Sequence, residues 1–89
     1  MPNTRATKQP RKPAVAVGYK YRYYSGEGNP NNYTFHVRGI VDSQQVVTRF
    51  WNKRKQRWSY GVEDMGYFEH YRENGYLIDL GRSPPDNVD

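Results

Sequence analysis

Residues 33–62 read YTFHVRGIVDSQQVVTRFWNKRKQRWSYGV, and this stretch decides the expected fold. Apolar and polar residues alternate within it in three runs, at 33–41, 45–51 and 58–62. A period of two indicates β-strands, because successive side chains of a strand point to opposite faces of the sheet. Short polar segments at 42–43 and 52–56 separate the runs, so we expect three strands joined by two tight turns.

The side chains of the second and third runs predict how these strands sit in the sheet. Both faces of the second run carry bulky residues, with Val47 and Trp51 on one side and Val46, Thr48 and Phe50 on the other. This pattern predicts a central strand. In the third run we expect the larger side chains to point inward, namely Trp58, Tyr60 and Val62.

The alternation also extends upstream of this stretch, over residues 14–24. One face of the expected strand collects Val15, Val17, Tyr19, Tyr21 and Tyr23. Its other face carries Lys20 and Arg22, as in a half-buried strand with one side open. Residues 25–32 read SGEGNPNN, a composition rich in Gly, Asn and Pro that predicts a loop.

Downstream of residue 62, the spacing of apolar residues changes to that of a helix. Asp64 is a suitable N-cap for a helix over 65–74, and Gly75 suits the position after its end, where φ is positive. Met65, Phe68 and Tyr71 form the apolar stripe, with Tyr67 beside them. Residues 76–80 predict a last short strand.

The order of strand, strand, strand, strand, helix and strand predicts an α+β domain that is mostly β. Either a small antiparallel meander sheet or a partly open barrel of SH3-like or OB-like shape fits this order, with one short helix near the C-terminus. At 89 residues the chain has room for one small domain. We expect a disordered basic N-terminal arm over 1–13, the β-rich domain over 14–81, and a loose acidic end over 82–89.

Charge is divided unequally along the chain. Up to Arg57 there are 12 Lys and Arg residues against two acids, whereas from Trp58 onward there are two Arg residues and seven acids. The local balances of +10 and −5 give the net charge of +5. A basic half rich in aromatic residues is typical of a module that holds a polyanion. The acidic half could pair with a basic protein, although a solvated helix face explains it equally.

The strongest local feature is the turn between Trp51 and Trp58, where four cations fall within five residues and an indole stands on each side. Cations neutralise phosphates and flat rings stack on bases, so this pattern favours binding of single-stranded nucleic acid. A basic β-ribbon in a major groove, a solvated turn and a buried Trp pair are the alternatives. The full set of candidate binding residues is Lys20, Arg22, Arg38, Arg49, Trp51, Lys53, Arg54, Lys55, Arg57 and Trp58.

The sequence offers little for catalysis, metal binding or membrane insertion. It has no cysteine, and His36 and His70 lack the spacing of a zinc motif. No apolar run approaches the roughly 20 residues that cross a bilayer, and no secretory signal is visible. We therefore expect a cytoplasmic protein that is not an enzyme and needs no cofactor or metal.

Residues 36–42, 45–47 and 50–60, with two Trp residues around a basic turn, resemble the small uncharacterised proteins of tailed bacteriophages. The resemblance covers about a third of the chain and supplies no catalytic or binding residues. It implies a protein made in the cytoplasm of an infected bacterium that acts on DNA or on a host protein.

These patterns together predict non-catalytic binding of DNA or RNA by the basic aromatic hairpin and the basic N-terminal arm. No helix-turn-helix, zinc-finger or RNP-like motif is present, so we expect little sequence specificity. The alternative is a phage protein that binds and inhibits or redirects a host nuclease, polymerase or defence complex. Exposed strand edges also leave room for a homodimer.

Overall fold

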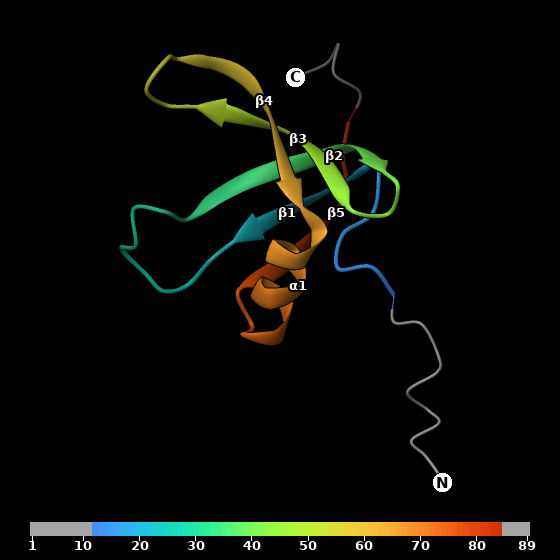
Figure 1. The fold of residues 1–89 in the computed structure, drawn as a ribbon. Coiled ribbons are helices and arrows are strands. Elements are labelled where there is room, and N and C mark those ends of the chain that lie inside the picture. The colour runs from blue at the N-terminus through green and yellow to red at the C-terminus, as the bar shows by residue number, and fades with distance from the viewer. Residues whose placement is uncertain (1–11, 85–89) are drawn as a thin grey trace, which may run out of the picture.

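In the computed structural model of the protein, residues 12–84 are described. Their elements, in chain order, are β1 (Tyr19–Tyr23), β2 (Tyr33–Val41), β3 (Gln45–Asn52), β4 (Arg57–Asp64), α1 (Met65–Glu73) and β5 (Leu77–Arg82). All strands pair antiparallel in one sheet of order β4-β3-β2-β1-β5 (Figure 1). The predicted class, mostly β with one short helix near the C-terminus, is confirmed.

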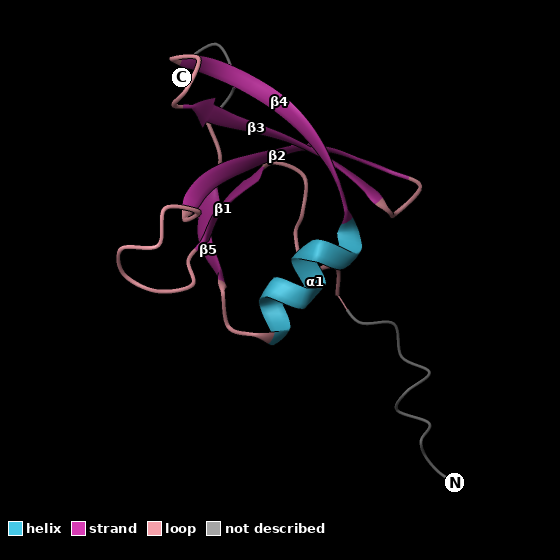
Figure 2. Ribbon diagram, turned by 60° about the vertical axis from the view of Figure 1, so that its left-hand side comes forward, coloured by secondary structure: helices cyan, strands magenta, loops and turns pink. Residues whose placement is uncertain are grey.

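Helix α1 explains why the last strand lies far from the strand before it. The helix starts at the end of β4, on one edge of the sheet, and crosses one face to deliver the chain to β5 beside β1 (Figure 2). Strands β4 and β5 therefore form the two opposite edges. Of the two architectures that the sequence allowed, the chain adopts the open meander sheet and not the barrel.

Two tight turns fix the registers of β2, β3 and β4, as the sequence predicted. Asp42 and Ser43 both have positive φ, at 52° and 61°, and the Gln44 amide donates to the Val41 carbonyl at 3.0 Å. Two consecutive positive φ angles match the twist of an antiparallel hairpin. In the next turn, the side chain of Asn52 accepts from the Lys55 amide at 3.1 Å.

Both ends of α1 carry the caps that the sequence predicted. The Asp64 carboxylate accepts from the Gly66 amide at 2.9 Å, which satisfies one of the free amides of the first turn. Gly75 has φ of 76°, and the Tyr76 amide donates to the Tyr71 carbonyl at 2.8 Å, as in a Schellman motif. The helix ends at Glu73, one residue before the expected end.

The hydrophobic core lies between α1 and the sheet. Phe35 of β2 and Phe68 of α1 are completely buried, and their ring centroids are 5.1 Å apart. The other buried apolar residues are Ala14, Val15, Tyr21, Val37, Val46 and Met65. The predicted stripe of Met65, Phe68 and Tyr71 therefore faces the core, whereas Tyr67 beside it is 56% exposed.

The expected strand over 14–24 is wrong in its first half, because β1 begins only at Tyr19. Gly18 has φ of 87°, and the Tyr19 amide donates to the Ala16 carbonyl at 3.3 Å, so the chain turns there. As a result Val15 is buried under the sheet but Val17 is exposed, although the alternation had placed both on one face.

Two expectations about the third and fourth strands are also corrected. Strand β3 is an interior strand, but β2 is the middle one. Tyr60 and Val62 of β4 do not point into the core: they lie on the face without the helix and are 59% and 60% exposed. The alternation of β4 was predicted correctly, but the wrong face was taken as the covered one.

The chain remains part of the sheet slightly beyond the predicted boundary at residue 81. Strand β5 extends to Arg82, and the Ser83 amide donates to the Gly18 carbonyl at 2.9 Å. Most of the expected basic arm, residues 1–11, and the end of the chain, 85–89, lie outside the described residues. Within residues 12–84, no helix is long and apolar enough to span a membrane.

Candidate nucleic-acid interface

The predicted binding residues of the strands lie on one face of the sheet, opposite α1. Tyr21, Phe35 and Phe50 are register partners on the helix side, so their chain neighbours point away from the helix. We call this second side the open face. Its residues include Lys20, Arg22, His36, Arg38, Arg49, Trp51, Trp58 and Tyr60.

The registers arrange these side chains in rows across the strands. Lys20 is opposite His36, His36 is opposite Arg49, and Arg49 is opposite Tyr60. In the neighbouring row, the guanidinium of Arg22 donates to the Thr34 hydroxyl at 3.3 Å. Lys20 and Arg22 were expected to extend the basic patch if the first strand lies beside the hairpin of Trp51 and Trp58. Strand β2 separates β1 from that hairpin, so the two cations share its face of the sheet without adjoining it.

Trp58, on the edge strand β4, is the ring around which several open-face side chains pack. The guanidinium carbon of Arg49 lies 4.3 Å from the centroid of the Trp58 ring, which is a cation–π contact. Trp51 meets the same ring edge-on, with centroids 5.7 Å apart and planes at 79°. Trp58 is half-buried by these neighbours, but Trp51 is 45% exposed. One of the two indoles is therefore free to contact a ligand.

Arg38 has a different setting from the other candidate cations. Its guanidinium donates to the Ser83 hydroxyl at 2.8 Å and to the Pro84 carbonyl at 2.9 Å. The ring of His36, which is buried, also hydrogen-bonds the Ser83 hydroxyl. These bonds hold residues 83–84 against the open face. Arg38 thus fixes residues 83–84 in place, and its charged group lies at the border of the open face instead of projecting from it.

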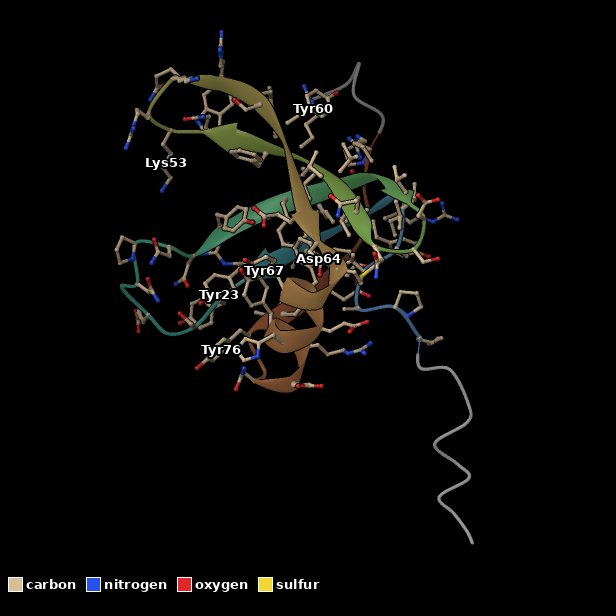
Figure 3. The ribbon with its side chains drawn as sticks, viewed as in Figure 1. Tyr23, Lys53, Tyr60, Asp64, Tyr67 and Tyr76 are labelled. Carbon is tan, nitrogen blue, oxygen red and sulfur yellow. The ribbon has the colours of Figure 1, made fainter. Side chains whose placement is uncertain are left out.

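The four cations of the turn between β3 and β4 are all exposed. Lys53, Arg54 and Lys55 form the turn, and Arg57 begins β4 opposite Asn52. Figure 3 shows Lys53 at the far end of this hairpin, away from α1. We call residues 53–57 the basic tip.

A hollow of about 260 Å³ connects the basic tip to the open face. Lys53, Trp51 and Trp58 of the β3–β4 hairpin line it on one side, and Arg22 of β1 and His36 of β2 line it on the other. Cations and aromatic rings therefore meet in one concave region.

Charge is divided across the sheet as well as along the chain. Glu63 and Asp79 are register partners of Val46 and Tyr21, so they lie on the helix side. Glu69 and Glu73 belong to α1 itself. These four acids thus lie on the side opposite Lys20, Arg22 and Arg49, which reduces repulsion of an anion at the open face.

Sequence reasoning missed three residues of this surface. Tyr60, exposed beside Arg49, was expected in the core; the alternation had grouped it with Trp58, and that grouping was the available signal. His36 and Ser83 carried no signal, because their contact joins residues 47 positions apart. Within residues 12–84, no three His, Cys, Asp or Glu side chains cluster in a way that could hold a metal ion.

No protein-family model, curated protein or solved structure matches the chain. The resemblance to phage proteins and the expected partners therefore stay predictions.

Proposed function

We propose that the protein binds single-stranded nucleic acid on the open face and the basic tip, without catalysing a reaction. The observation that carries this proposal is the stack of Arg49 on Trp58 beside the exposed ring of Trp51. A guanidinium and an indole lie together on the face of the sheet that the helix does not cover. They supply what a single-stranded nucleic acid needs: positive charge for its phosphates and flat surfaces for its bases.

The two parts of the surface have separate roles in this proposal. Trp51 provides a stacking platform, and stacking on an aromatic ring is worth about 1–3 kcal/mol per base. Lys53, Arg54, Lys55 and Arg57 neutralise phosphates, because exposed cations on a turn follow a flexible backbone easily. Neither contact reads the hydrogen-bonding edge of a base, so the proposed binding has little sequence specificity.

A second candidate function rests on the edge strand β4. Tyr60 and Val62 are exposed on the same strand as Trp58, and aromatic residues such as Tyr60 anchor protein partners. The partner would be a host protein if the resemblance to phage proteins holds, and the place of action would be the bacterial cytoplasm. In that case a single ring would carry most of the affinity, whereas nucleic-acid binding is spread over many contacts.

The test is fluorescence anisotropy of labelled single-stranded and duplex 12-mers over a salt series. We expect micromolar or tighter binding of single strands at low salt, with weaker binding of the duplex. Replacing Lys53, Arg54 or Lys55 singly by Ala is expected to reduce the slope of log affinity against log salt by about 0.7 each.

Lys12→Ala is the matched control. Lys12 is exposed, and its backbone carbonyl accepts a hydrogen bond from the Arg72 side chain of α1 at 2.8 Å, so truncating the Lys12 side chain leaves that bond intact. The salt slope of this variant is expected to equal that of the wild type. Failure of the wild type to bind any oligonucleotide at low salt would contradict the proposal.

A further inference from the structure

A second concave surface lies on the helix side of the sheet, between the basic tip and the loop that joins β1 to β2. It has a volume of about 730 Å³, within the range of small-molecule sites. Pro30 and Asn31 of the loop form one wall, and Lys53 and Lys55 form the opposite rim. Figure 3 shows Lys53 and Tyr23, which both line this surface, on the same side of the molecule. We call it the groove.

Aromatic rings form the floor of the groove. Tyr23 and Tyr71 have centroids 4.6 Å apart, and Tyr33 meets Phe50 edge-on at 6.1 Å. All four rings are half-buried, in contrast to the fully buried Phe35 behind them. Their inner sides therefore support the core, and the remaining ring surface is available to a flat ligand.

Gly61 keeps the groove open. A Cβ atom at this position of β4 would lie 3.3 Å from a ring carbon of Phe50 and 3.4 Å from the Thr48 hydroxyl. Any larger side chain would occupy the space above Phe50. A glycine inside a strand often marks a place where a ligand approaches closely, and its φ here is not one that requires glycine.

Charges of both signs line the groove. Lys53 and Lys55 line it at the basic tip, and Glu63 lines it near the end of β4 where α1 begins. Burial, with smaller contributions from Tyr71 and Glu63, raises the pKa of Tyr33 to about 12. Glu63 is therefore electrostatically close to the aromatic floor. A carboxylate accepts hydrogen bonds, and the amino groups of nucleobases donate them.

We propose that the groove binds one unstacked nucleobase of the bound strand, with its phosphate on Lys53 and Lys55 and its amino group towards Glu63. This proposal rests on the proposed function, because the groove is a second site on the same strand. The groove and the hollow on the open face share Tyr33, Trp51 and Lys53. A strand that leaves Trp51 can therefore pass the basic tip and place its next base in the groove.

The test compares Gly61→Val, which fills the groove, with Gly39→Val. At Gly39 a Cβ would meet only Val47, at an ordinary 3.8 Å, and this position does not line the groove. With a labelled 12-mer of deoxycytidine, Gly61→Val is expected to weaken binding about 5- to 150-fold, the loss of one stacked base. Gly39→Val is expected to stay within about twofold of the wild type.

NMR titration of the wild type with the same 12-mer tests directly whether the groove contacts the strand, without any variant. The amide signals of Gly61 and Glu63 are expected to shift, together with those around Trp51. If the strand binds but these two signals stay in place, or if Gly61→Val folds and binds like the wild type, the groove proposal is overturned and the proposed function stands. If the wild type binds no strand at all, the proposed function itself fails.

Discussion

The two faces of the sheet use aromatic residues in different ways. On the helix side, rings pack on rings: Phe35 lies 5.8 Å from Tyr21, 5.5 Å from Tyr33 and 5.1 Å from Phe68. On the open face, a ring also packs on a cation: Trp58 contacts Arg49 as well as the ring of Trp51. The same residue class therefore builds a core on one side and a charged surface on the other.

This difference shows how little separates a core ring from a surface ring in a small domain. Tyr21 is buried and its neighbour Arg22 lies on the open face, one residue further along the same strand. What distinguishes the faces is the helix, which covers only one of them. The comparison predicts that substitutions of the buried core rings act mainly on stability and those of exposed open-face residues mainly on binding.

The largest expected effect is that of Phe68→Ala. Phe68 is completely buried against Phe35, and truncating such a ring costs about 3–5 kcal/mol through lost burial and the cavity left behind. Domains of this size have only about 5–10 kcal/mol of stability, so a large part would be lost. Urea unfolding followed by circular dichroism measures the change.

Tyr67→Ala is the control for this prediction, because Tyr67 is the preceding residue of the same helix and is 56% exposed. Its free energy of unfolding is expected to change by less than about 0.5 kcal/mol. Equal losses in the two variants would mean that α1 does not bury the face described above.

Next in size is the effect of Trp51→Ala on binding. Removing the exposed indole is expected to weaken the binding of single strands by about 1–3 kcal/mol. The free energy of unfolding is expected to fall by less than about 1 kcal/mol, the usual value of a cross-strand aromatic pair. Anisotropy and urea unfolding of the same preparation separate the two effects, and a loss confined to stability would break the contrast between the faces.

The smallest expected effect is confined to alkaline pH and concerns Tyr33. Because burial raises its pKa to about 12 from an ordinary value of 10, the folded state keeps the proton that the unfolded state releases. Its contribution to stability is thus fully present below pH 10 and is lost as the pH rises from 10 to 12. Absorbance at the phenolate band during alkaline titration measures the ionisation, and Tyr33→Phe is expected to remove the last phenol to titrate.

Most of the fold could be predicted from local patterns. Alternation of period two located β2, β3 and β4. The turn residues at 42–43 marked the boundary between β2 and β3, and the caps at Asp64 and Gly75 marked the two ends of α1. The break at Gly18 was visible as a glycine within an alternating run, but alternation alone favoured a continuous strand.

What could not be predicted is which face the helix covers. Alternation divides the residues of β4 into two sets without saying which set is buried, and the answer depends on the contact of Phe68 with Phe35, 33 residues away in the chain. The candidate site had the same limit. The basic tip was evident from sequence, but the rows that join Lys20, Arg49 and Tyr60 depend on the registers of four strands.

The hydrogen bonds of His36 and Arg38 to Ser83 have a practical consequence for how the protein can be attached to a surface. Pro84 is held by Arg38 on the open face, whereas Lys12 is held by Arg72 of α1 on the other side. The described chain therefore begins on the helix side of the sheet and ends on the open face. An affinity tag or surface linker attached after residue 84 begins beside Trp58 and competes for access, while one attached before residue 12 leaves that side clear. Immobilisation through the N-terminal side is the orientation to choose for a sensor.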